Sequence, residues 1–158
     1  MDQETYCELC RNTCIALGIG DIDSLANEGY LSIEGINIQF IFDEMFFNDR
    51  ILCVCEIGII KEELKEKILE SLLMLNFLTG SKTTGVFAVD PINQCASFVV
   101  TLINPENLSA DQLADLLRCY ISRNLFLQRT LFMSGELSLP IDCDNSEFDN
   151  FSKNWQLA

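Results

Sequence analysis

The sequence contains no histidine and has few cations for its length. Lys and Arg together number 10 among 158 residues, against 24 Asp and Glu, which gives a formal net charge of −14. Without histidine, the commonest general base and every triad built on it are missing, which argues against an enzyme. Nucleic acid and anionic membranes are recognised by clustered Lys and Arg, so we expect neither as a partner.

Long apolar runs and phosphate-binding loops are missing as well. No stretch of about 18 apolar residues occurs, so no membrane-spanning helix is expected. The start, Met1-Asp2-Gln3-Glu4, is acidic where an export signal is basic, and no apolar segment follows it. This predicts a cytoplasmic protein. The segment from Gly80 to Gly85 fits neither of the common phosphate-binding patterns.

Apolar residues are plentiful, at 49% of the chain. A disordered acidic tail is poor in apolar residues, whereas this chain can bury enough apolar surface to fold. Its length predicts one domain. We expect that domain to span residues 1–133, and the polar, acidic residues 134–158 to form a C-terminal tail. A heavily acidic surface over a large apolar inventory favours a protein that binds another protein.

The eight cysteines allow three interpretations. A structural zinc site needs four ligands, and Cys53-x-Cys55 is a poor second pair for the cysteines near the N-terminus. A redox motif follows a strand, whereas Cys7, Cys10 and Cys14 fall at the spacing of one helical face. The favoured interpretation is that reduced thiols pack as small hydrophobic groups, with no metal and no cofactor.

Periodicity predicts an α+β chain with the order α-β-β-β-α-β-β-α and an antiparallel sheet of about five strands. Ser109 and Gln112 form a capping box, which sets the start of the last helix. A polar loop is expected over 21–29. The expected helices are 2–18, 61–77 and 109–127, and the expected strands are 30–33, 36–42, 51–57, 85–89 and 95–103.

The hairpin turn after residue 42 is unusual because it contains Met45, Phe46 and Phe47. These large residues either fold back onto the core or form an exposed apolar patch, and such patches mark interaction sites.

The order of elements resembles that of the class I type III secretion chaperones, the CesT-like Tir chaperone family. Leu72, Leu75 and Asn76 are similar to that family's Leu-x-x-x-Asn region, and Gly85 then opens a strand pair with an acidic turn at Asp90. The last helix is also similar, with matching apolar residues at Leu113, Leu116, Leu117 and Ile121.

The resemblance implies a bacterial, cytoplasmic homodimer linked to virulence, which binds the N-terminal segment of one or a few secreted effectors in an extended, export-competent form. In that family the second helix supplies dimer contacts, which here implies Leu64, Ile68, Leu72 and Leu75. The alternative is a regulatory or adaptor module of similar fold without a secretion role. The first helix and first sheet segment are the expected effector-binding region, with Cys10, Cys14, Phe40, Phe42, Phe46, Phe47 and Ile51 as candidates.

Overall fold

The structure, a computed structural model, describes residues 1–46, 48–79 and 85–132. The predicted α+β class and order of elements are confirmed. The predicted tail, 134–158, and Phe47 lie outside the described residues.

The elements are α1 (Gln3–Leu17), the π-helical turn η1 (Ser24–Glu28), β1 (Tyr30–Ile33), β2 (Ile36–Ile41), β3 (Arg50–Ile59), the 3-10 turn η2 (Glu62–Leu64), α2 (Lys65–Thr79), β4 (Gly85–Val89), β5 (Cys95–Ile103), the 3-10 turn η3 (Pro105–Asn107), α3 (Ala110–Leu127) and the π-helical turn η4 (Gln128–Phe132).

The five strands form one antiparallel sheet in the order β1-β2-β3-β5-β4. A tight turn at Glu34 and Gly35 joins β1 to β2, and both residues have positive φ, as a two-residue hairpin of this hand requires. The register of β3 against β5 shifts between Glu56 and Gly58. Because β1 and β4 come first and last in the strand order, they are the two edges of the sheet.

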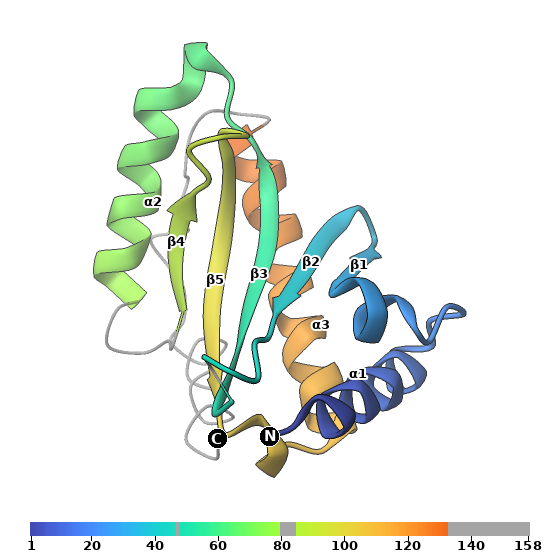
Figure 1. The fold of residues 1–158 in the computed structure, drawn as a ribbon. Helices are drawn as coiled ribbons and strands as arrows, with labels where there is room; N and C mark the ends of the chain where they lie inside the picture. The colour runs from blue at the N-terminus through green and yellow to red at the C-terminus, as the bar shows by residue number, and fades with distance from the viewer. Residues whose placement is uncertain (47, 80–84, 133–158) are drawn as a thin grey trace.

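The helices are distributed unequally around the sheet. Helix α3 lies behind the sheet in the view of Figure 1, in contact with β2 and β3, and α1 packs against α3. Helix α2 runs beside the edge strand β4. No described helix covers the face turned toward the viewer, which we call the outer face. Among the described residues, no helix is both long enough and apolar enough to cross a membrane.

Capping residues set the ends of α3 and α1, and the capping box predicted at Ser109 is present. The Ser109 hydroxyl accepts a hydrogen bond from the Gln112 N–H, and the Gln112 side chain accepts one from the Ser109 N–H. Asp2 caps α1 by accepting from the Thr5 N–H at 2.8 Å, and Gly18 ends that helix in the left-handed conformation.

The core lies between α3 and the inner face of the sheet. Alternate residues of β3 face it and are buried, in agreement with the period-two pattern of the sequence. The expectation of a polar loop over 21–29 is corrected, because η1 forms there and buries Leu25 and Ala26. Because these two apolar side chains are buried, the segment is a packed turn and not a solvated loop.

Phe98 of β5 is at the centre of an aromatic cluster in this core. Its ring lies 5.0 Å from that of Phe87 and 5.7 Å from that of Tyr120, centre to centre. The guanidinium carbon of Arg123 lies 3.5 Å from the centre of the Phe98 ring. Burial lowers the pKa of Arg123 to about 10. A cation over an aromatic face recovers part of the desolvation cost by attraction to the ring quadrupole.

Candidate partner-binding surfaces

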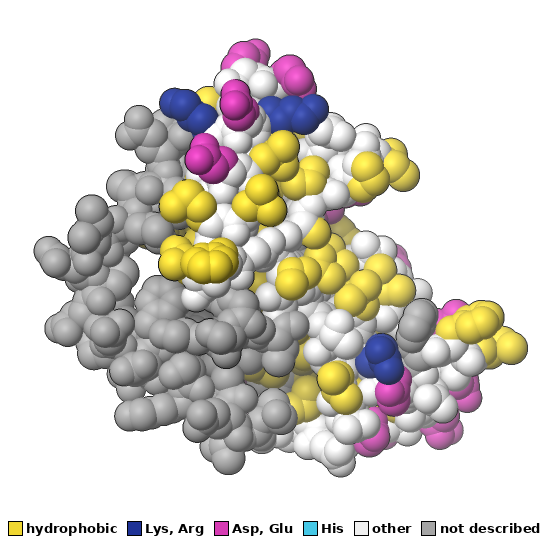
Figure 2. All heavy atoms as spheres, turned by 90° about the vertical axis from the view of Figure 1, so that its left-hand side faces the viewer, with side chains coloured by type: hydrophobic (Ala, Val, Ile, Leu, Met, Phe, Trp, Pro, Cys, Tyr) yellow, Lys and Arg dark blue, Asp and Glu magenta, His cyan; other side chains and the backbone are white. Residues whose placement is uncertain are grey.

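The first candidate surface is an exposed apolar patch on α2, which we call the α2 patch. Phe77 is 88% exposed, and Val86 of the adjacent strand β4 is 55% exposed. Figure 2 shows hydrophobic side chains gathered on this side of the molecule, below a cluster of charged side chains. Patches of this kind mark interaction surfaces. The α2 patch consists of Leu73, Met74, Phe77, Leu78 and Val86.

The second candidate surface is the free edge of β1. In an antiparallel hairpin, the pairs next to a two-residue turn alternate between hydrogen-bonded and non-hydrogen-bonded. The hydrogen bond from the Phe40 N–H to the Gly29 carbonyl, at 2.7 Å, fixes the phase of this alternation. The backbone N–H and C=O groups of Tyr30 and Ser32 therefore point away from β2. Both residues are exposed, so this edge can accept another strand.

The opposite edge is closed at its middle. Asn76 of α2 donates from its side-chain nitrogen to the Phe87 carbonyl at 2.9 Å, and its side-chain oxygen accepts from the Phe87 N–H at 2.7 Å. The side chain thus takes the place of a neighbouring strand at this point of β4. Strand addition is consequently favoured at β1 over β4.

The outer face of the sheet adjoins the β1 edge and is rich in apolar side chains. The strand registers align one row of residues across all five strands. A second row contains Ile41, which is 45% exposed, opposite Leu52. An added strand at β1 would place alternate side chains beside these rows. The first row is Tyr30, Gln39, Val54, Val99 and Val86.

The connection between β2 and β3 holds two apolar side chains outward. Met45 is 88% exposed and Phe46 is 76% exposed. The Asp43 carboxylate accepts from the N–H of Met45 at 2.9 Å and from that of Phe46 at 3.2 Å, which fixes the turn. For these two residues, the exposed-patch interpretation of the sequence is correct and the folded-back one is wrong.

Four of the predicted effector-binding residues are not on any surface. Cys10, Cys14 and Ile51 have no exposed area, and Phe40 is 4% exposed. The prediction is corrected for these four, because the α1–α3 packing and the inner sheet face enclose them. Phe42 is half-buried and stacks on Tyr6, with the ring centres 4.6 Å apart.

The predicted dimer residues, three on α2 and Leu64 on η2, face inward. Ile68, Leu72 and Leu75 are buried within their own chain, and Leu64 is half-buried against the same core. The surface that α2 leaves exposed is made of other residues, those of the α2 patch. Helix α2 is apolar on more than one side, and this is the signal in the sequence that could have revealed a second apolar surface.

The core buries four of the cysteines, Cys10, Cys14, Cys53 and Cys55. Cys53 and Cys55 lie with their sulfur atoms 3.7 Å apart in the core. Burial raises the pKa of the Cys10 thiol to about 12, and burial also raises the pKa of Cys14. Thiols that hold their protons this strongly are poor nucleophiles and poor metal ligands. No group of three or more metal-ligating side chains occurs within 1–46, 48–79 and 85–132.

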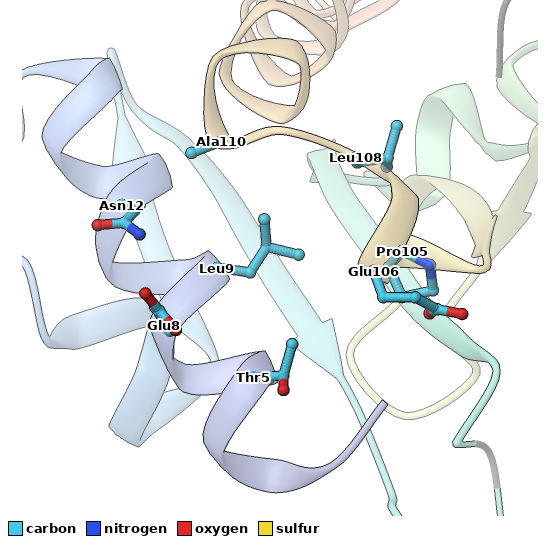
Figure 3. A pocket seen from close by; sticks show the side chains of 8 residues that line it. All are labelled: Thr5, Glu8, Leu9, Asn12, Pro105, Glu106, Leu108 and Ala110. Atoms are coloured by element: carbon cyan, nitrogen blue, oxygen red, sulfur yellow. The ribbon is translucent and has the colours of Figure 1, made fainter.

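The last candidate is a shallow groove of about 200 Å³ between α1 and the connection from β5 to α3. The Leu9 side chain points into this space from α1 (Figure 3). The opposite wall carries Pro105 and Leu108, and Glu8 and Glu106 stand on the two sides. We call this feature the α1–η3 groove. Its remaining lining residues are Thr5, Asn12 and Ala110.

With this geometry established, the fold can be compared with known proteins. No family model and no curated protein matches the sequence. Among solved structures, a chain of the crystal structure of the ExsC–ExsE complex is similar, with a TM-score of 0.63 and 14% identity. The alignment covers 82% of this chain and 96% of that one. That complex is a type III secretion chaperone–effector structure. The chain therefore shares the fold of that structure, as the resemblance in its sequence predicted.

Proposed function

We propose that this protein is a bacterial, cytoplasmic chaperone that binds the N-terminal segment of one or a few type III secreted effectors. The segment is held extended and competent for export. The observation that carries the proposal is the free β1 edge beside an apolar outer face. An extended segment gains backbone hydrogen bonds at such an edge and places alternate side chains on the adjoining apolar surface.

The chaperone fold shared with a chain of the ExsC–ExsE complex supports this role over catalysis. We further propose that two copies associate through the α2 patch, since the contact would bury its five large apolar side chains, which are otherwise exposed to water. The proposed dimer contact thus uses the exposed residues of the α2 patch in place of the buried residues predicted from the sequence.

The experiment is co-expression with the N-terminal segments of candidate secreted proteins, scored by co-purification. The informative variant is Ser32→Pro, which removes the outward N–H of β1 and blocks strand addition. Proline is tolerated on an edge strand where the N–H faces solvent. Ser32→Ala is the matched control, because it keeps the N–H and changes the same side chain.

We expect Ser32→Pro to lose the partner segment while Ser32→Ala retains it, with both variants folded by circular dichroism. Equal retention by the two variants would exclude strand addition at β1. Limited proteolysis of the complex distinguishes the adaptor alternative: an effector segment cleaved as fast as the free peptide would contradict the chaperone role.

A further inference from the structure

Arg123 of α3 is a cation in the core whose charge is only partly compensated. Its guanidinium carbon lies 3.5 Å from the centre of the Phe98 ring and 5.6 Å from that of the Phe87 ring. The Nε and Nη2 atoms of the same group are buried and have no hydrogen-bond partner among the described residues. An N–H group that is buried without a partner costs free energy, and the cost is larger for a charged group. The ring faces offset only part of this cost, so a further partner is expected.

The part of the chain that the structure describes supplies no carboxylate to Arg123. The four ion pairs found within it all use other cations. The titratable groups in it that act on Arg123 are Tyr120, Cys55 and Cys119, and none of these is a carboxyl group. Burial therefore prevails and lowers the pKa of Arg123 to about 10. An acceptor for the two N–H groups has to come from outside these residues.

The residues that follow η4 in the chain are rich in carboxylates. Segment 134–158 contains five Asp and Glu against one Lys. Arg123 lies near the end of α3, and η4 then continues the chain to Phe132. At about 1.5 Å of rise per residue, these two residues are separated by roughly 14 Å. Because an extended chain covers about 3.3 Å per residue, the carboxylates from Asp142 onward can reach the guanidinium.

We propose that a carboxylate of segment 134–158 binds the Arg123 guanidinium and so anchors the C-terminal segment at the aromatic cluster of Phe98. The Nε–H and one N–H of Nη2 point to the same side of the planar guanidinium, and a bidentate carboxylate accepts from such a pair. The two nitrogens without partners are therefore those that this contact uses. A tethered segment acts at an effective concentration of about millimolar order, so the same chain supplies the carboxylate ahead of another protein. The contact does not depend on effector binding.

The test is made on the full chain by neutralising the five carboxylates of segment 134–158, which leaves Arg123 and the core in place. Proton exchange with water at the Arg123 Nε–H, followed by NMR spectroscopy, reports on the contact at the guanidinium itself. We expect exchange about tenfold faster in this variant than in the native chain, the factor that loss of a charge-assisted hydrogen bond produces. The segment variant is Glu136→Gln/Asp142→Asn/Asp144→Asn/Glu147→Gln/Asp149→Asn.

A matched control separates a local pairing from the general negative charge. It removes the same number of carboxylates, all of them exposed and before β3, and should leave the exchange rate unchanged. The control variant is Glu4→Gln/Glu8→Gln/Glu28→Gln/Glu34→Gln/Glu44→Gln. Equal exchange in the native chain and the segment variant, or equal acceleration by both variants, would overturn the proposal. Exchange that accelerates on dilution of the native chain would also overturn it, because the carboxylate would then come from a second copy.

Discussion

The side chain of Asn76 forms with Phe87 both backbone hydrogen bonds that a neighbouring strand would form. An amide side chain presents one donor and one acceptor in nearly the geometry of a peptide group, so it can end a sheet at a single position. This contact joins the end of α2 to β4 and makes the helix part of the sheet edge. The free energy of unfolding should depend on it.

Replacing Asn76 by alanine should lower the free energy of unfolding by about 1–3 kcal/mol, because it leaves a half-buried backbone donor and acceptor without partners. Urea unfolding followed by circular dichroism measures the loss. Asn27→Ala is the control, since Asn27 is exposed and its side chain lies outside this contact. An Asn76→Ala variant as stable as Asn27→Ala would show that solvent replaces the two hydrogen bonds without cost.

Gly85→Ala should destabilise the protein by about 1–3 kcal/mol, as overpacking of a filled core does. A Cβ atom at this position would collide with the ring of Phe98, which Arg123 and two other rings hold in place. Gly20→Ala is the matched control, because its added Cβ meets nothing within 4 Å and the φ of Gly20 is not positive. Thermal unfolding of the two variants compares them directly. Equal midpoints would contradict the packing described around Phe98.

Light scattering at micromolar concentration should give about twice the 17.9 kDa of one chain, if the α2 patch joins two copies. Phe77→Glu should return the mass to that of the single chain, because burying a carboxylate among apolar groups is costly. Ile15→Glu is the control, since Ile15 is 58% exposed on α1 and lies apart from the α2 patch. A wild-type mass of one chain would reject the dimer.

Stability should fall as the pH rises above about 9. The folded Cys10 thiol has its pKa raised by burial from 9.0 to about 12, so between these values the unfolded state binds fewer protons. Burial raises the pKa of Tyr6 and Tyr120 as well, which acts in the same direction. The lowered pKa of Arg123 acts oppositely but involves one group. Urea unfolding at pH 7.5 and about pH 10 measures the difference, and a stability that stays constant would contradict this account.

The alternation of apolar residues was enough to predict the strands but not which of their faces is buried, because Phe40 and Ile51, predicted to bind a partner, face the core. For β3, one face of the strand is buried along its whole length, so period two is a direct record of burial. The capping box at Ser109 was equally informative, because it depends on residues three apart in the chain. Local signals therefore predicted most of the fold.

The binding surfaces were less predictable, because exposure is decided by contacts between distant segments. Four apolar residues in succession, 72–75, give α2 no unique inward face, and the structure buries Leu72 and Leu75 while exposing Leu73 and Met74. The spacing of Cys10 and Cys14 predicts one apolar face of α1, but only the contact of α1 with α3 shows that this face is buried within the chain.

The closure of β4 by Asn76 also limits how copies of this chain can assemble. A sheet that is open at both edges can join copies edge to edge without end, which leads to fibres. Here the open edge is β1, so pairing of two copies through it would use both open edges and stop at a closed pair. The Asn76 contact thus keeps the middle of β4 from serving as a second adhesive edge, so the sheet offers no edge-to-edge route to a fibre.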